Sequence, residues 1–372
     1  MKVTLSGDAL NTAVGWVAKM LPARPAIPVT AGILIDAGEQ LSLSVFDFVT
    51  AGAVNVPGAV VDPGRALVSG VLLARVAKVA RGGEVDLVAD GGGKLRVTAG
   101  SSRWNLPLLA LENYPELPAV GDVLGELDGE VLRTALARVL PAVAKGNAAA
   151  SLPALGGVSL AADGGVLTIA ATDRYRLAVA EVAWPGEPFA QIVVPGELLG
   201  DVLGVLGAGV VLRCDQSTVT AESGAHRVSG PLSADEFPRF ESLLDVTGDV
   251  VTVLPVAGLQ ASVERVSAVL GAVGVLRLDV TADGARLSAS SEDEADAGDE
   301  CSVVSHHGPD LTVGLNPGYF ADALGGIGTE LVVLTVPARA NPPLLLRPVG
   351  SDGAPVAGYE HLVMSCKLAD RS

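Results

Sequence analysis

The sequence predicts an α+β fold in which one small unit, an antiparallel sheet packed on two helices, occurs three times. Three recurring features predict it: amphipathic helices, alternating strands that end at an acidic residue, and a strand–Gly–helix junction. A chain of 372 residues exceeds one typical core, so two or three domains are expected. Because 49% of the residues are apolar, each domain can bury a core of its own.

The first recurring feature is an amphipathic helix. Apolar residues at helical spacing form one stripe per helix, and a stripe of this kind predicts a helix that buries one face. Three stripes follow one another along the chain: Leu10, Val14, Val17 and Leu21; Leu132, Leu136, Val139 and Val143; Leu259, Val263, Val266 and Leu270.

The second feature is an alternating strand closed by an aspartate. Asp47, Asp173 and Asp293 end these three runs at a near-constant interval. In the middle copy, alternation places Leu167 and Ile169 on one strand face. The residues that follow, 172–176, turn polar and set two arginines around a tyrosine.

The third feature is a strand followed by a glycine and a second helix, at Gly70, Gly196 and Gly318. Several markers in one order at a near-constant interval, too long for a solenoid repeat, predict three homologous domains. Their predicted bounds are 1–120, 121–247 and 248–372. Gly-rich segments such as 90–93 and 163–165 predict hairpin turns between short strands.

Composition excludes several classes of protein. A net charge of −17 argues against nonspecific nucleic-acid binding, unless a basic face is hidden by the overall balance. Cys214, Cys301 and Cys366 are scattered and form no CxxC pair, so neither a disulfide framework nor a thiolate metal site is indicated. We expect no cofactor and no metal. No apolar run reaches membrane-spanning length, and residues 1–5 form a strand without a signal region, which favours the cytoplasm.

No catalytic motif is present in the sequence. His226, His306, His307 and His361 lack HExxH spacing, and neither GxSxG nor GxxxxGK[ST] occurs. Asp173, flanked by arginines, fits a structural ion pair better than an acid site. An enzyme is therefore not predicted, whereas an acidic β-rich binding protein that does not act on DNA remains an alternative.

An ordered set of motifs covers essentially the whole chain. It consists of Arg24 in 21–25, the run 171–177, the segment 236–240, the segment 314–317 leading to 322–324, and the tail 359–368. This set resembles the bacterial DNA polymerase III beta subunit, the sliding clamp. The resemblance implies a non-enzymatic processivity factor in which two copies close head to tail into a ring. It further implies that sheets lie outside and helices line a hole around duplex DNA, where weak phosphate contacts permit sliding.

The resemblance implies that basic residues on the inner helices face DNA. Arg75 and Lys78 are three apart and share a helix face, and Arg138 and Lys145 are seven apart on the third helix. A solvated helix face explains each of these residues equally well. The full predicted set is Lys19, Arg24, Arg75, Lys78, Arg81, Arg133, Arg138 and Lys145.

The resemblance also implies a groove between the second and third domains for short hydrophobic peptides of the polymerase III catalytic subunit, the clamp loader and repair proteins. Aliphatic walls with a few polar anchors suit such a motif, although most of these aliphatics would also fit a core. The predicted groove residues are Leu155, Thr172, Arg174, Tyr175, Arg176, Leu177, Pro238, Ser242, Leu243, Asn341, Pro343, Leu362, Val363, Met364, Ser365, Cys366, Lys367 and Leu368.

The tail departs from the family pattern, which commonly reads Met-Pro-x-Arg-Leu and then stops. Here Ser365 replaces the proline, which frees the backbone, and Lys367 replaces the arginine, which removes a planar fork of donors. We therefore predict a remodelled groove. The chain is either a divergent housekeeping clamp or a second clamp whose groove rejects an inhibitor and so gives antibiotic resistance.

The ring implied by the resemblance joins the first domain of one copy to the third domain of the other. Opposite charges on the two faces would steer a heterologous contact that closes after two copies. The acidic run 292–300 also fits a solvated loop. The predicted interface residues are Arg96, Arg103, Trp104, Leu106, Val269, Leu270, Glu294 and Glu300.

Overall fold

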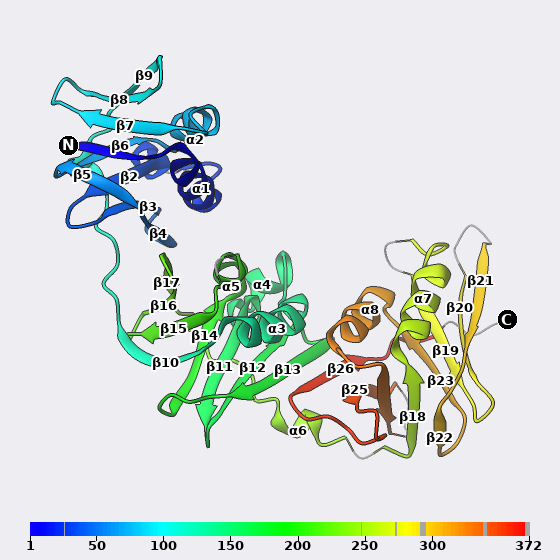
Figure 1. The fold of residues 1–372 in the computed structure, drawn as a ribbon. Helices are drawn as coiled ribbons and strands as arrows, with labels where there is room; N and C mark the ends of the chain where they lie inside the picture. Colours follow the sequence, from blue (N-terminus) through cyan, green and yellow to red (C-terminus); the bar gives the residue numbers. More distant parts are fainter. Residues whose placement is uncertain are drawn as a thin grey trace. The chain divides into compact units, whose positions relative to one another are not determined.

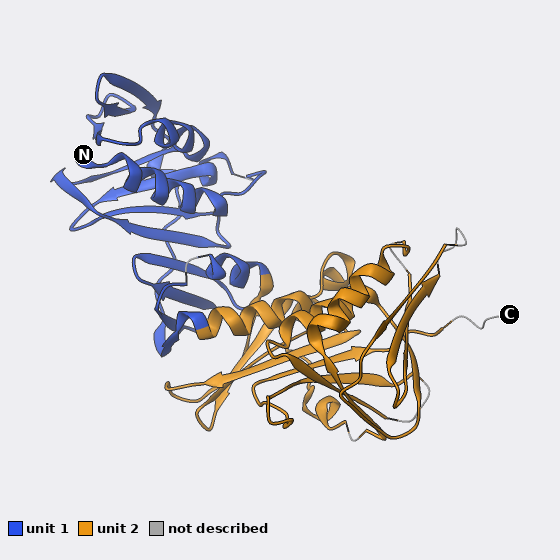
Figure 2. Ribbon diagram, turned by 45° about the vertical axis from the view of Figure 1, so that its right-hand side comes forward, with its two compact units in different colours: residues 1–130, 197–232 blue, residues 131–196, 233–372 orange. Residues whose placement is uncertain are grey.

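The computed structural model describes residues 1–25, 27–204, 206–246, 248–271, 274–290, 295–337 and 341–368. The chain divides into two compact units, residues 1–130 with 197–232 and residues 131–196 with 233–372 (Figure 2). Both units combine antiparallel sheets with helices, so the predicted α+β class is confirmed (Figure 1).

The first unit contains a five-stranded sheet of order β5-β1-β7-β8-β9 and an eight-stranded sheet of order β10-β15-β16-β17-β4-β3-β2-β6. Their strands are β1 (Lys2–Ser6), β2 (Gly32–Ala37), β3 (Leu41–Phe46), β4 (Ala51–Val56), β5 (Gly58–Asp62), β6 (Gly64–Ser69), β7 (Glu84–Ala89), β8 (Lys94–Ala99), β9 (Ser102–Pro107), β10 (Asp122–Asp128), β15 (Gly209–Cys214), β16 (Thr218–Ser223) and β17 (His226–Pro231).

Helices α1 (Gly7–Val17) and α2 (Gly70–Val79) cover the core of this unit, and the short helices η1 (Ala18–Met20), η2 (Pro28–Ala31) and η3 (Leu111–Asn113) lie in its connections. The predicted stripe of α1 is buried at Leu10, Val14 and Val17. Glycine suits the start of α2 at Gly70, because a Cβ there would lie 2.3 Å from Cδ1 of Leu21 and 3.1 Å from the Ala31 carbonyl oxygen.

The second unit contains a nine-stranded sheet of order β14-β11-β12-β13-β26-β25-β24-β18-β22 and a four-stranded sheet of order β21-β20-β19-β23. Their strands are β11 (Gly157–Asp163), β12 (Val166–Thr172), β13 (Arg176–Ala183), β14 (Phe189–Pro195), β18 (Val250–Pro255), β19 (Leu276–Val280), β20 (Ala285–Ser290), β21 (Asp296–Cys301), β22 (Ser305–His307), β23 (Leu311–Leu315), β24 (Leu331–Val336), β25 (Pro343–Val349) and β26 (Tyr359–Met364).

The remaining helices supply the other predicted pairs. Helices α3 (Gly129–Val139) and α5 (Gly196–Leu203) each include residues assigned to both units, and α7 (Val256–Ser267) and α8 (Pro317–Gly326) belong to the second. Shorter helices are η4 (Leu140–Ala142), α4 (Asn147–Ser151), η5 (Pro153–Gly156) and α6 (Glu241–Leu244).

Sheets run across the boundaries of the repeats, which the sequence did not indicate. Strand β17 pairs with β4, and β13 pairs with β26 with Leu177 opposite Leu362. Each pairing satisfies backbone groups that an edge strand would otherwise expose. The middle repeat is consequently shared: β10 and β15 to β17 belong to the first unit, and β11 to β14 to the second.

Candidate functional site

An apolar groove of about 480 Å³ opens within the second unit. The side chains of Leu155, Leu177 and Leu362 are buried there, whereas Leu243 is 53% exposed. The residues that line the groove are Leu152, Ala154, Leu155, Thr172, Arg174, Arg176, Leu177, Glu236, Pro238, Arg239, Phe240, Leu243, Leu362 and Met364.

Four segments bring these side chains together. The pairing of β13 with β26 sets Leu177 beside Leu362, and the α4–η5 segment contributes Leu152 and Leu155. Segment 236–243 supplies the fourth wall, and it is anchored from within by the rings of Phe237 and Phe240, whose centroids lie 6.1 Å apart. The groove is therefore a product of the tertiary fold.

The turn between β12 and β13 forms one wall. Oδ1 of Asp173 accepts hydrogen bonds from the backbone N–H groups of Tyr175 and Arg176, both at 3.0 Å. The Thr172 hydroxyl donates to the Arg176 carbonyl at 2.7 Å and accepts from the Arg174 N–H at 3.1 Å. These bonds hold Arg174 at φ 79°, in the left-handed region that non-glycine residues rarely occupy.

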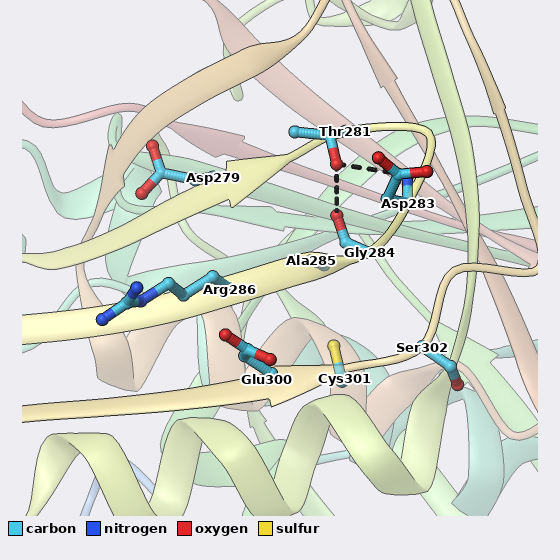
Figure 3. Close-up of a pocket in the computed structure, with 9 residues that line it drawn as sticks. All are labelled: Asp279, Thr281, Asp283, Gly284, Ala285, Arg286, Glu300, Cys301 and Ser302. Carbon is cyan, nitrogen blue, oxygen red and sulfur yellow. Dashed lines mark hydrogen bonds between the residues drawn. The ribbon is translucent and has the colours of Figure 1, made fainter.

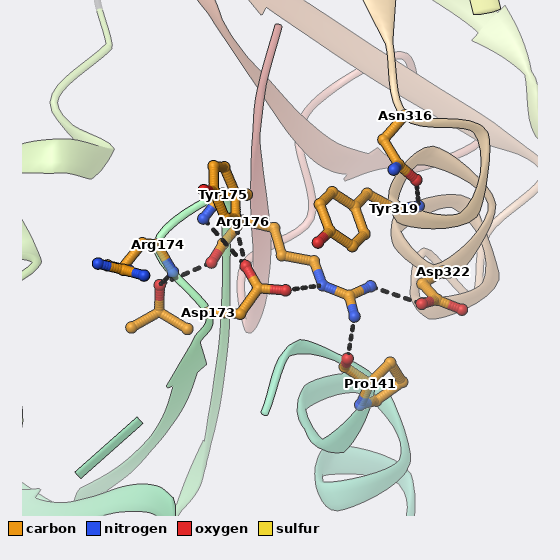
Figure 4. A network of polar contacts seen from close by, with 9 residues as sticks. Pro141, Asp173, Arg174, Tyr175, Arg176, Asn316, Tyr319 and Asp322 are labelled. Carbon is orange, nitrogen blue, oxygen red and sulfur yellow. Dashed lines mark hydrogen bonds and ion pairs between the residues drawn. The ribbon is translucent and has the colours of Figure 1, made fainter. Parts of the chain in front are cut away.

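Arg176 ends this turn and is 8% exposed. Figure 4 shows its guanidinium among groups from three other elements: Nε lies 3.0 Å from Oδ2 of Asp173, and Nη1 lies 2.5 Å from Oδ2 of Asp322 on α8. Nη2 donates to the Pro141 carbonyl, and the Tyr319 ring centroid lies 4.3 Å from the guanidinium carbon. The predicted structural ion pair of Asp173 is confirmed.

Half of the predicted groove set lines the groove, namely Leu155, Thr172, Arg174, Arg176, Leu177, Pro238, Leu243, Leu362 and Met364. The other half does not, namely Tyr175, Ser242, Asn341, Pro343, Val363, Ser365, Cys366, Lys367 and Leu368. Sequence reasoning missed Leu152, Ala154, Glu236, Arg239 and Phe240. The motif 236–240 was the available signal for three of them.

Strand geometry, ring stacking and backbone pairing explain why Val363, Tyr175 and Cys366 lie outside the groove lining. Val363 is buried on the strand face opposite Leu362 and belongs to the core. Tyr175 turns to Tyr319, with ring centroids 6.5 Å apart. The tail is drawn away because the Cys366 N–H donates to the Gly314 carbonyl at 2.8 Å, where β23 ends.

The altered tail carries a buried hydroxyl and a half-buried thiol. The Ser365 hydroxyl oxygen is buried and has no hydrogen-bond partner among the described residues. Burial raises the pKa of the Cys366 thiol, so this sulfur is a weak nucleophile near neutral pH. Residues 369–372, which follow Leu368 where the family's tail pattern stops, lie outside the described residues.

The basic residues predicted to face DNA are only partly on helices. Arg75 and Lys78 are exposed on α2, and Arg133 lies on α3. Lys145 does not continue the α3 face as predicted, because α3 ends at Val139 and the separate short helix η4, which contains Pro141, begins at Leu140. Arg138 lies on α3 and is half-buried, with its guanidinium carbon 5.3 Å from the Tyr359 ring centroid.

The other three predicted DNA-facing residues lie beyond helix ends. Lys19 is exposed in η1, and Arg24 is exposed in the loop that follows it. Arg81 follows the end of α2 and pairs with Asp8, with Nε 3.4 Å from Oδ1. Arg81 was predicted to lie on the second helix, which ends at Val79, whereas Lys19 and Arg24 were predicted at the end of the first.

The predicted interface set is divided between surface and core. Leu106 is buried in the core of the first unit, and Trp104 packs against that core. Arg103 is exposed on β9, and Arg96 forms an ion pair with Asp90 at 3.6 Å. Val269 and Leu270 follow α7 and are half-buried, and Glu300 is exposed on β21. Glu294 lies outside the described residues.

A second, polar hollow of about 560 Å³ lies along the four-stranded sheet (Figure 3). Asp279, Arg286 and Glu300 stand opposite one another on β19, β20 and β21, so their charges alternate across the sheet. The described residues contain no group of three or more His, Cys, Asp or Glu arranged to hold a metal. None of the described helices is both long and apolar enough to cross a membrane.

The helix-backed antiparallel sheets place the chain in the processivity-clamp class of proteins. Three family models match the chain: DNA polymerase III beta subunit, N-terminal domain over residues 1–118, central domain over 126–239 and C-terminal domain over 245–359. The chain belongs to the DNA polymerase III beta subunit family. Sliding clamps of this family are non-catalytic processivity factors, in agreement with the prediction that the chain is not an enzyme.

Relatives resemble the chain over its whole length. The beta sliding clamp of Streptomyces coelicolor is 33% identical over 380 aligned positions, which cover 99% of this chain and 100% of that protein. The beta sliding clamp homolog GriR of Streptomyces muensis is 26% identical, with 99% and 100% covered.

Solved structures share the fold. The DNA polymerase III subunit beta of Pseudomonas aeruginosa has a TM-score of 0.90 at 25% identity, covering 99% of this chain and 100% of that one. A Pseudomonas aeruginosa sliding clamp bound to griselimycin has a TM-score of 0.88 at 25% identity with the same coverage.

Proposed function

We propose that two copies of this chain close head to tail into a ring around duplex DNA in the cytoplasm. The ring tethers the polymerase III catalytic subunit, the clamp loader and repair proteins through short hydrophobic segments. The observation that carries the proposal is the groove of about 480 Å³ in the second unit, with Leu243 on its rim. Family membership favours this function over that of an acidic binding protein unrelated to DNA.

The groove has the chemistry that a short linear motif requires. Leu155, Leu177 and Leu362 form its apolar floor, and burying a leucine or phenylalanine side chain on it contributes about 1.5–3 kcal/mol. Arg174 and Glu236 are exposed at its edge, where they supply charged anchors that fix the orientation of a peptide.

Two edge strands support the head-to-tail ring. β9 is an edge of the five-stranded sheet and exposes Arg103, whereas β21 is an edge of the four-stranded sheet and exposes Asp296 and Glu300. An edge strand has unpaired backbone groups, which an edge strand of a second copy would pair. The opposite side-chain charges of β9 and β21 would favour this contact between two copies. Sedimentation tests this: a dimer is expected at micromolar concentration and low salt, and a monomer contradicts the ring.

DNA retention is expected to be topological. Lys19, Arg24, Arg75, Lys78 and Lys145 are exposed, but the net charge of −17 opposes tight phosphate binding. After loading onto nicked circular DNA by a clamp loader, the protein should stay on circles and leave after linearisation. Retention on linear DNA, or failure to stay on circles, contradicts the proposal.

The second candidate is an inhibitor-tolerant second clamp. Its support is the likeness to GriR, the replacement of the family proline and arginine by Ser365 and Lys367, and the turning of the tail away from the groove. A displacement assay with a polymerase-derived peptide tests it, with the Streptomyces coelicolor clamp as the reference. Weak displacement by griselimycin with ordinary peptide affinity supports tolerance, and ordinary affinity for both rules it out.

A further inference from the structure

We propose that Asp322 on α8 is a positioning residue for the groove, acting through Arg176 on the turn 172–176. It touches no residue of a bound peptide itself, because it does not line the groove. The proposal rests on the proposed function of the groove and names the residue that shapes one of its walls.

Arg176 connects the groove to α8. It lines the groove, yet its guanidinium is directed inward and is 8% exposed (Figure 4). Asp322, the other member of the ion pair, is accessible to solvent, since its side chain is 44% exposed. Asp322 is therefore the accessible member of an ion pair whose other member is buried in the groove wall.

Replacing the Asp322 carboxylate by an amide would leave Nη1 of Arg176 facing a neutral acceptor in place of its counter-charge. A buried guanidinium that loses a counter-charge is left with a larger desolvation cost, which it relieves by turning toward water. Asp173 and the Pro141 carbonyl still hold Nε and Nη2, so the arginine would shift rather than leave its site. The groove is the open space next to it, and the shift would alter the groove wall.

A second residue of α8, Tyr319, also contacts the turn 172–176. The Tyr319 ring covers the guanidinium of Arg176 and stacks on Tyr175. The Tyr175 carbonyl accepts a hydrogen bond from the Met364 N–H at 2.8 Å, and Met364 lines the groove. A shift of the turn is thus expected to reach Met364 through the backbone.

The chain provides a specific probe of this shift, because it has only three methionines and Met1 and Met20 belong to the other unit. Methyl-labelled methionine NMR of the full chain without peptide would follow Met364, with Met20 as the internal reference. Three variants are compared: Asp322→Asn, Asp322→Glu and Glu264→Gln. The last removes an exposed carboxylate from α7 in the same unit and serves as the matched control.

We expect Asp322→Asn to move the Met364 signal and leave Met20 unchanged, while Asp322→Glu restores most of the wild-type position. A fluorescein-labelled peptide from a polymerase III catalytic subunit should bind Asp322→Asn about fivefold more weakly, with Glu264→Gln unchanged. The melting temperatures of the two amide variants should agree closely. This agreement separates positioning from a loss of stability.

An unmoved Met364 signal in Asp322→Asn overturns the proposal, and so does an Asp322→Glu variant that behaves like the amide. If the wild-type chain fails to bind the peptide, the proposed function of the groove fails. The Met364 comparison still tests the role of Asp322 in that case, so the two failures are distinguishable.

Discussion

Nη1 of Arg176 lies 2.5 Å from Oδ2 of Asp322, 146 residues away along the chain. The contact joins the strand end at the groove to a helix of the last repeat. An ion pair with one buried member is weak evidence for stability, because removing the Arg176 charge from water costs about as much as its attraction to Asp322 returns. Its effect is on geometry: the turn has one position in which the charges of Asp173 and Asp322 are both satisfied.

Arg176→Met should strongly destabilise the second unit. The variant keeps much of the side-chain volume but leaves Asp173 buried without its cation, which costs about 3–5 kcal/mol of unfolding free energy. Urea unfolding followed by Trp184 fluorescence, in a Trp16→Phe, Trp104→Phe background, reports on this unit. Arg347→Met, which breaks the half-exposed pair with Glu360, is the control at about 1 kcal/mol or less. Equal losses would contradict the prediction.

His361 should make the second unit sensitive to acid. Burial first, and the charge of Arg176 second, lower the pKa of its imidazole from 6.5 to about 3. Between these two pKa values the His361 imidazole is protonated in the unfolded chain but neutral in the folded chain. The free energy of unfolding therefore falls as the pH drops from about 6.5 toward 3. Between pH 6.5 and 5 the loss is about 2 kcal/mol.

His361→Asn removes the titrating group and should flatten this slope, although the variant is less stable at neutral pH. Urea unfolding at several pH values between about 5 and 7.5 provides the comparison. An unchanged slope in the variant would assign the acid sensitivity to other groups. The imidazole Nδ1, which lies 2.8 Å from the Tyr359 hydroxyl, is the atom whose environment the experiment probes.

Two adjacent glycines of α8 should respond in opposite ways to alanine. A Cβ at Gly326 would lie 2.2 Å from the Tyr359 hydroxyl oxygen, so Gly326→Ala overpacks the core and costs about 1–3 kcal/mol. A Cβ at Gly325 meets nothing within 4 Å, and Gly325→Ala should stabilise the helix by about 0.5–1 kcal/mol. Thermal unfolding of the two variants side by side measures the change in stability that each causes. A change of the same sign in both variants would refute the packing account.

Leu243→Asp should weaken peptide binding without unfolding the protein. The side chain is 53% exposed on the groove rim, so a carboxylate there stays solvated in the free protein but opposes an apolar peptide. We expect about a tenfold loss of affinity in fluorescence anisotropy. Val304→Asp, at an exposed valine outside the groove lining, is the matched control and should bind normally. A loss of equal size in the control would assign the effect to net charge.

The sequence determined the repeated unit of this protein. Leu10, Val14 and Val17 are spaced so that only a helix buries all three, and they are buried on α1. Gly70 and Gly196 mark strand–helix junctions because a Cβ at either position would press on Leu21 or Val143. Local spacing and local steric limits suffice for such features, which is why the helices and many strands were predictable.

The tertiary structure decided where each side chain points and which repeats share a sheet. Leu362 and Val363 are neighbours of similar chemistry, yet the pairing of β26 with β13 sends one to the groove and the other to the core. The link from Asp322 to Arg176 has no local signature either, because the two residues meet only after distant segments pack together. Contacts of such sequence separation depend on the whole fold, and one chain's residue spacing does not encode them.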